Sequence, residues 1–223
     1  MAEATVSDTT LLISSKNYSS WSLRGFLLAR LSGLPFREQV VAADDPATRA
    51  ELLLQSSSIL VPCLVHEGVR VWDTMAIAEY LHEVRPKAGM YPLDRPARAR
   101  CRSISGEMHS GFSALRSSLP MNLRGRRPGF TVWSGARADI ARILAIWEEC
   151  LQTWGGPYLF GRRLTVADAM YAPVVTRFVT YDVTLAGAAA AYAARILDWP
   201  DLCEWTAAAE AEPEQIEDLE VEF

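Results

Sequence analysis

A change of pattern near Pro86 constrains the fold of this chain more than any other feature of its sequence. Over residues 10–85, short apolar runs alternate with helical stretches, whereas strand signals nearly vanish afterwards and long helical patterns follow. The segment between the two parts, RPKAGMYPLDRP, holds three prolines and is typical of a domain boundary. With 223 residues, the chain is long enough for two domains, each with its own core.

The first part predicts a small mixed sheet covered by helices. We expect a strand at Thr10–Ser14, a helix at Ser20–Gly33 that ends at its glycine, a strand at 36–41, a short helix at 47–54, a hairpin at 63–72 that turns at Glu67-Gly68, and an amphipathic helix at 73–86. We place Arg24 and Arg30 on the water-facing side of the first of these helices.

The second part predicts an all-helical unit. Its helical patterns cover residues 97–119, 136–153 and 166–179, with shorter ones after Gly187 and Pro200. Residues 121–135, MNLRGRRPGFTVWSG, predict a loop rich in hydrogen-bond donors.

Composition narrows the function classes. No apolar run approaches the roughly 20 residues of a membrane span, and the N-terminus lacks the features of an export signal. The four cysteines are scattered, with no C-x-x-C pair and no cluster with histidines, so we expect neither disulfides nor a metal site, and we expect Cys63 to be a buried, inert thiol. These features favour a cytoplasmic protein without a membrane partner.

Charge argues against a nucleic-acid partner, because the formal net charge is −5. Its distribution is uneven: arginines concentrate over residues 95–142, and residues 204–223 carry eight acids and no base. The pattern is compatible with plain solvated faces or with a groove that attracts anions.

Two dipeptides beside the predicted hairpin have the residue types needed to bind a peptide-like ligand. Val61-Pro62 comes directly before a strand, where a cis bond would leave the Val61 backbone free to pair with an extended ligand. Asp73-Thr74 opens a helix, where a hydroxyl and free N–H groups suit a carboxylate and an acid suits an ammonium group. Taken singly, they also fit an ordinary turn and an ordinary helix cap.

In this order, the motifs resemble those of the cytosolic glutathione transferases that use a serine, such as a bacterial member of the zeta or beta type. The resemblance rests on VP-x-L…G…D-T-x-A-I-x-x-Y-L and on GRRLTVADAMYAPVV, in which Thr165 and Asp168 have capping-box spacing. It extends over nearly the full chain. It implies a thioredoxin-like α/β domain at residues 1–86, a linker at 87–93 and an all-α domain at 94–223 that receives the acceptor substrate.

The resemblance also implies a glutathione site. A hydroxyl of the loop SSWSLR would stabilise the glutathione thiolate; Ser19 is the first candidate, Ser20 the second, and Tyr18 and Ser14 remain alternatives. Arg24 would orient this site or serve only as a structural partner. The remaining cofactor-binding assignments are the Val61 backbone beside Pro62 for the cysteinyl part, Thr74 for the γ-glutamyl carboxylate and Asp73 for its amino group.

One feature departs from the family pattern. The residues before Pro62 include no lysine or glutamine at the place that would reach the glycine carboxylate of glutathione. The substitutes open to the chain are Gln55, Ser57, Lys16 and an arginine of the second domain.

The acceptor substrate would meet donors of the helical part. The candidates, whose side chains suit a carboxylate or an enolate, are His109, Arg116, Asn122, Arg124 and Arg177. The same pattern is also typical of solvent-exposed residues without a binding role. In isomerase relatives an arginine near Arg177 holds the substrate carboxylate, but that position aligns with Thr180 here.

The sequence therefore predicts a homodimeric glutathione transferase that acts on a small electrophile. The alternatives are a glutathione-dependent isomerase of the maleylacetoacetate or maleylpyruvate type, a peroxidase, or a non-catalytic relative that binds proteins in a stress response.

Overall fold

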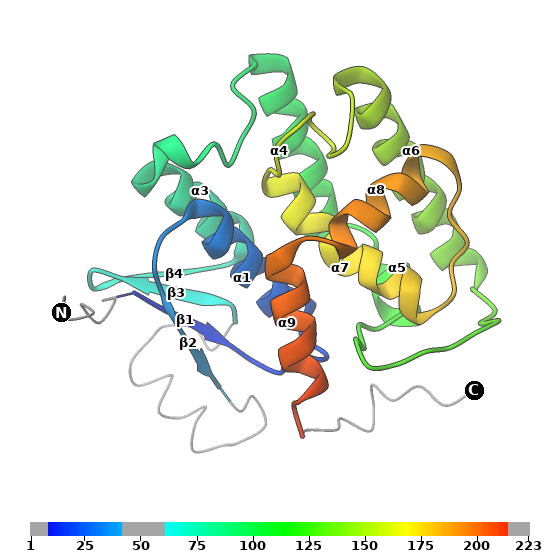
Figure 1. Ribbon diagram of the computed structural model, residues 1–223, viewed down its shortest axis with the longest axis horizontal. Coiled ribbons are helices and arrows are strands. Elements are labelled where there is room, and N and C mark those ends of the chain that lie inside the picture. Colours follow the sequence, from blue (N-terminus) through cyan, green and yellow to red (C-terminus); the bar gives the residue numbers. More distant parts are fainter. Residues whose placement is uncertain (1–8, 42–60, 214–223) are drawn as a thin grey trace.

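The computed structural model describes residues 9–41 and 61–213 (Figure 1). The helix expected at 47–54, together with Gln55 and Ser57, lies outside the described residues.

A four-stranded mixed sheet forms the first part of the chain. Its strands are β1 (Thr9–Ile13), β2 (Arg37–Val40), β3 (Cys63–His66) and β4 (Val69–Trp72), in the order β2-β1-β3-β4. β1 pairs parallel with β2 and antiparallel with β3, and β3 pairs antiparallel with β4. Glu67 and Gly68 both have positive φ, 49° and 80°, as a two-residue hairpin turn requires, so the expected turn is confirmed.

Two helices cover one face of this sheet. They are α1 (Ser20–Ser32), which ends at Gly33 in the left-handed region, and α3 (Thr74–Val84). Because side chains alternate along a strand, Leu11 and Leu64 face these helices, whereas Leu12 and Cys63 pack together on the other face. Cys63 is buried, as expected.

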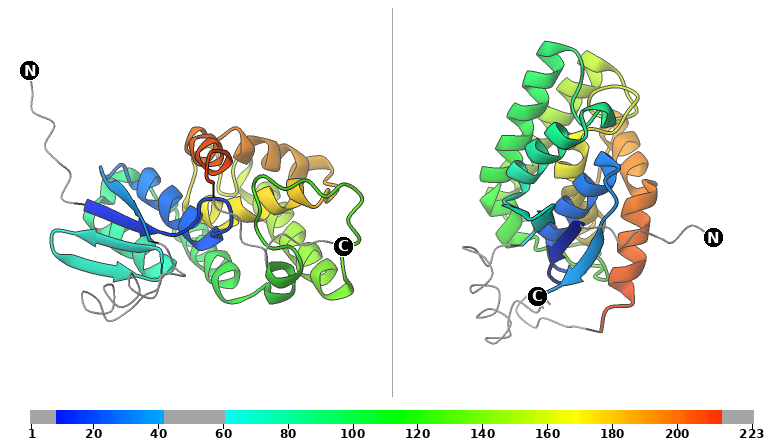
Figure 2. Two further views of the ribbon diagram at one scale, coloured as in Figure 1. Left: turned by 90° about the horizontal axis from the view of Figure 1, so that it is seen from below. Right: turned by 90° about the vertical axis from the view of Figure 1, so that its left-hand side faces the viewer.

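Helices make up the rest of the described chain. After the short 3-10 helix η1 (Pro86–Ala88) come α4 (Arg95–Ser110), α5 (Ser113–Ser118), α6 (Ser134–Trp154), α7 (Val166–Thr180), α8 (Gly187–Leu197) and α9 (Pro200–Glu210). Figure 2 shows the sheet at one end of an elongated molecule and these helices at the other. The expected two-part fold class, α/β followed by all-α, is confirmed.

The prediction of one helix over 97–119 is wrong, because the helix is interrupted between α4 and α5. Gly111 is extended, and a Cβ there would lie 2.7 Å from the Glu107 carbonyl oxygen. Phe112 follows in the left-handed region at φ 56°. A single glycine therefore ends α4 where apolar spacing alone continues it.

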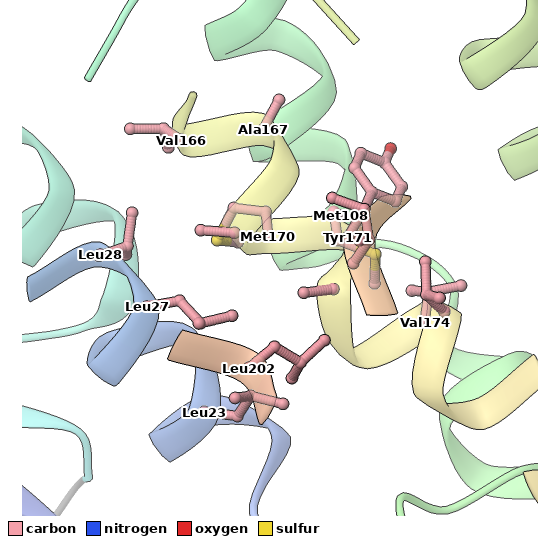
Figure 3. Packing of buried hydrophobic residues seen from close by; sticks show 14 of the residues in the cluster. Leu23, Leu27, Leu28, Met108, Val166, Ala167, Met170, Tyr171, Val174 and Leu202 are labelled. Carbon is pink, nitrogen blue, oxygen red and sulfur yellow. The ribbon is translucent and has the colours of Figure 1, made fainter. Parts of the chain in front are cut away.

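The first helix is buried between the sheet and α7. Leu23 and Leu27 of α1 lie near Met170 of α7 and Leu202 of α9 (Figure 3), and all four belong to one continuous core. This contact fixes the start of α1 against the helical part of the molecule.

Several classes of feature are absent from the part of the chain that the structure describes. None of its helices combines the length and the apolar character needed to cross a membrane. Over the same ranges, no three His, Cys, Asp or Glu side chains form a group suited to a metal ion. All four cysteines are free thiols.

The expected cap of α7 is present. The Asp168 carboxylate accepts hydrogen bonds from the Thr165 backbone N–H at 2.7 Å, from the Thr165 hydroxyl at 2.8 Å and from the Leu159 N–H at 3.2 Å. Burial raises the pKa of Asp168 to about 6, against the three hydrogen bonds, which favour the charged form.

We predict that Asp168 makes the protein less stable as the pH rises through about 6. Its folded pKa lies above its unfolded value, so its contribution to stability is complete only below the unfolded pKa of 3.8. Relative to Asp168→Asn, the unfolding free energy of the wild type should fall by about 2 kcal/mol between about pH 4.5 and about pH 7. Denaturant unfolding of both proteins across this range measures it, and a constant difference would contradict it.

Candidate functional site

Serine hydroxyls join the end of β1 to the start of α1. Ser19 is the N-cap of α1, and its Oγ accepts a hydrogen bond from the Ser22 N–H at 3.2 Å and donates to Ser22 Oγ at 2.9 Å. Ser22 Oγ in turn accepts from the Ser14 N–H at 3.0 Å. Ser22 is fully buried, whereas Ser19 stays partly exposed. The Ser19 hydroxyl is thus held in place yet reachable from outside.

The start of α1 is electrically unbalanced. Its first turn contains no acidic residue, so no side chain there offsets the positive end of the helix dipole. An anion placed beside Ser19 would meet this field together with the hydroxyl.

Ser20 lies in different surroundings. It is buried, and its Oγ accepts from Arg24 Nη1 at 3.3 Å and from Arg177 Nη2 at 3.2 Å. Ser20 therefore connects α1 to α7 through two guanidinium groups.

The prediction that Arg24 faces water is wrong. Arg24 is fully buried; its Nε donates to the Met170 carbonyl at 2.8 Å and its guanidinium lies 4.6 Å from the Trp21 ring centroid. The helical part covers this side of α1, a contact that the periodicity of α1 alone does not reveal. The expected water-facing position is correct for Arg30, which is exposed.

Two of the candidate acceptor residues, Arg177 and Asn122, are buried and bound to protein atoms. Arg177 donates through Nε to the Leu119 carbonyl at 2.8 Å, besides its bond to Ser20. Asn122 Oδ1 accepts from Asn17 Nδ2 and from the Gly125 N–H, each at 3.0 Å. Their present contacts order the loop beside the site.

Three arginines gather around Trp21 and Ser20. Arg116 is partly exposed, and its guanidinium lies 5.6 Å from the Trp21 ring centroid. Arg24 contacts the same ring. Burial, with repulsion from the neighbouring arginines, lowers the pKa of Arg24, and burial lowers the pKa of Arg177 to about 10. Within the described ranges no carboxylate pairs with any of the three, and Arg24 Nη2 has no hydrogen-bond partner. The group therefore attracts anions.

Asp73 and His109 join the start of α3 to α4. Asp73, at φ 75°, caps α3 by accepting from the Met75 N–H at 2.8 Å, and its other oxygen lies 2.7 Å from His109 Nε2. The His109 ring packs on Trp21 at 5.2 Å between centroids. Thr74 is buried at the first position of α3. Trp21 thus contacts both Arg24 and His109, with Arg116 also near its ring.

The bond between Val61 and Pro62 is cis, the geometry that would leave the Val61 backbone free to pair with a ligand, and Pro62 packs against α1. A Cβ at Gly25 would lie 2.5 Å from Pro62 Cβ, so this glycine allows the close approach. Gly25 is not among the residues predicted to matter, although an isolated glycine inside an apolar helix is a signal of such an approach.

Lys16 and Arg124 both have partners. Lys16 Nζ lies 2.6 Å from Glu38 Oε2. Arg124 Nη1 donates to the Glu212 carbonyl at 2.6 Å and Nη2 donates to Tyr18 Oη at 3.2 Å. Glu212 is not identifiable from the sequence alone, because nothing in the acidic C-terminal segment distinguishes one glutamate from another.

Two models of known protein families match most of the chain. A model described as "Glutathione S-transferase, N-terminal domain" matches residues 18–84, and one described as "Glutathione S-transferase, C-terminal domain" matches residues 96–209.

Individual relatives agree with these matches. Maleylacetoacetate isomerase of Rattus norvegicus is 31% identical over 56% of each chain, so the alignment spans little more than half of that protein. Maleylacetoacetate isomerase of Rhizobium meliloti (strain 1021) is 30% identical over 75% of this chain and 81% of its own. A glutathione transferase homolog from Burkholderia GL BGR1, crystallised with bound glutathione, has a similar fold, with a TM-score of 0.66, 21% identity and coverage of 92% of this chain and 99% of its own.

We predict that Gly25→Ala separates α1 from Pro62 and destabilises the protein. The added methyl group overlaps the proline ring, which should cost about 1 to 3 kcal/mol of unfolding free energy.

Gly106→Ala is the matched control, because Gly106 lies within α4 and a Cβ there meets nothing within 4 Å. It should stabilise the protein by about 0.5 to 1 kcal/mol. Thermal unfolding measures the stability change in both variants. Equal changes in the two would contradict the close contact between Gly25 and Pro62.

Proposed function

Because the chain belongs to the glutathione S-transferase family, we propose that it is a transferase that ionises glutathione at the start of α1 and delivers the thiolate to a small electrophile. The observation that carries the proposal is the partly exposed Ser19 hydroxyl at the uncompensated N-terminus of α1. As part of the same proposal, the protein acts as a cytoplasmic homodimer.

Ser19 is the group that we assign to the sulfur. Its hydroxyl hydrogen now points to Ser22 Oγ and can turn to a thiolate, while its oxygen keeps the bond from the Ser22 N–H. A hydrogen bond to the charged form lowers the thiol pKa, and the helix dipole acts in the same direction. Ser20 is the weaker candidate because Arg24 and Arg177 enclose its oxygen.

The rest of the tripeptide would lie along the first part of the fold. The Val61 backbone, next to the cis bond, would pair with the cysteinyl residue, and Thr74 would hold the γ-glutamyl carboxylate at the N-terminus of α3. Asp73 would face the ammonium group, although one of its oxygens already lies 2.7 Å from His109 Nε2. Binding of glutathione therefore competes with the contact between Asp73 and His109.

The electrophile would lie against Trp21, between Arg116 and His109. The thiolate attacks the electrophilic carbon there, and the leaving group departs or the new carbanion takes a proton. Holding both reactants together supplies proximity, which is a major part of catalysis by such a site. Asn122, Arg124 and Arg177 would support this side of the site from their bonds to the protein.

We predict that Ser19→Ala raises the pKa of enzyme-bound glutathione by about one unit and lowers kcat for conjugation about tenfold or more. Ultraviolet titration of the bound thiolate and steady-state kinetics measure the two effects. Ser103→Ala, which changes an exposed serine of α4, is the control and should alter neither.

Ser20→Ala separates the two candidate serines. It should lower the melting temperature, because two buried guanidinium groups lose an acceptor, and leave the thiol pKa near that of the wild type. A shifted pKa in Ser20→Ala with an unchanged one in Ser19→Ala would transfer the role to Ser20. Absence of glutathione binding in calorimetry would favour a non-catalytic protein instead.

A second candidate function is glutathione-dependent cis–trans isomerisation of a carboxylate-bearing substrate. The three arginines around Trp21, without a carboxylate partner in the described residues, favour it. Relatives named maleylacetoacetate isomerase point the same way.

We predict that Arg116→Gln raises the KM for a carboxylate-bearing acceptor about tenfold and changes the KM for a neutral chlorinated aromatic less than about twofold. The control, Arg195→Gln, removes an exposed arginine of α8 and should change neither. Equal effects of Arg116→Gln on both acceptors would rule out an anion-selective site.

A further inference from the structure

The Glu212 carboxylate lies against the loop that precedes α1, although Glu212 is two residues beyond the end of α9. One carboxylate oxygen accepts from the Ser15 hydroxyl at 2.7 Å and from the Asn17 N–H at 3.0 Å, and the other accepts from the Lys16 N–H at 2.9 Å. We refer to these three bonds as the Glu212 clasp.

The clasp is a specific arrangement for an anion. Two successive backbone N–H groups and a hydroxyl converge on one charged group, which is the geometry of an anion-binding nest. Each bond is charge-assisted, and the backbone donors have no strand or helix partner at these positions. Removing the carboxylate would leave donors of the loop unsatisfied.

Ser15 transmits the clasp to Ser19. The same Ser15 hydroxyl that donates to Glu212 accepts from the Tyr18 N–H at 3.3 Å, and the Ser15 carbonyl accepts from the Ser19 N–H at 3.0 Å. The backbone of Ser19 is therefore tied to Glu212 through one intermediate residue.

Other contacts keep the two ends of the clasp together. Trp205 Nε1 of α9 donates to the Lys16 carbonyl at 2.9 Å. Arg124 donates through its backbone N–H to Asn17 Oδ1 at 3.0 Å and through Nη1 to the Glu212 carbonyl at 2.6 Å. The loop before α1 thus takes its shape from the last described residues of the chain.

We propose that Glu212 is a positioning residue that sets the Ser19 hydroxyl at the start of α1 for the thiolate. The inference rests on the proposed function, in which Ser19 contacts the glutathione sulfur. Glu212 touches neither reactant in this role; it acts through Ser15.

The test compares Glu212→Gln with Glu210→Gln in the full-length protein. Gln keeps the size of Glu212 but loses the charge and replaces one acceptor with a donor that opposes the loop N–H groups. Glu210→Gln makes the same chemical change at an exposed position two residues away. Circular dichroism and thermal unfolding establish that both variants fold.

Two readouts are needed. The first is amide hydrogen exchange without glutathione, which should become about tenfold or more faster at Lys16, Asn17 and Ser19 in Glu212→Gln and stay unchanged in Glu210→Gln. The second is catalysis: kcat should fall about tenfold and the pKa of bound glutathione should rise, while the KM for glutathione changes less than about threefold.

The outcomes separate the clasp from the proposed function. Unchanged exchange in Glu212→Gln would overturn the clasp whatever the reaction is. Faster exchange with unchanged kcat and thiol pKa would overturn the positioning role and leave a structural one. If the wild type fails to bind glutathione, the proposed function falls, and the positioning role falls with it, whereas the exchange result still tests the clasp. Glu212→Asp, which keeps the charge, should restore part of the lost kcat.

Discussion

Burial of α1 on two sides is the constraint from which the geometry of the site follows. The sheet and Pro62 fix one side of the helix, with Gly25 allowing close contact, and α7 fixes the other side through the contacts of Arg24 and Ser20. A helix held in this way cannot shift its first turn without disturbing both parts of the core. The position of the Ser19 hydroxyl is therefore determined by packing far from the hydroxyl itself.

The same packing explains the unusual charge around Trp21. Arg24 and Arg177 are buried because they connect α1 to α7, and apart from Arg24 Nη2 their nitrogens donate to backbone carbonyls and to Ser20. Without a carboxylate partner among the described residues, this structural connection also leaves a positive field beside the start of α1. In our account, one set of contacts supports both the fold and the stabilisation of a thiolate.

Local patterns were sufficient to predict much of this arrangement. The hairpin turn, the glycine end of α1 and the cap of α7 each depend on neighbouring residues, and the structure confirms each prediction. The bond before Pro62 is cis, which is the geometry considered for that dipeptide beside an ordinary turn. The burial of Arg24 and the contact of Glu212 with Lys16 depend on segments far apart in the chain. The break at Gly111 is local, but apolar spacing alone does not indicate it. Residue types and spacing do not indicate such long-range contacts. The sequence therefore identifies Ser19 and Ser20 as candidates but not the distant residues that fix their positions.

The central claim is that glutathione places its sulfur beside Ser19 at the N-terminus of α1. A crystal structure of the complex with glutathione tests it most directly. The account predicts the sulfur within hydrogen-bond distance of Ser19 Oγ, with the peptide backbone paired to Val61 and its γ-glutamyl end at Thr74. A complex in which the sulfur points away from Ser19, or in which the tripeptide lies elsewhere on the protein, would contradict it.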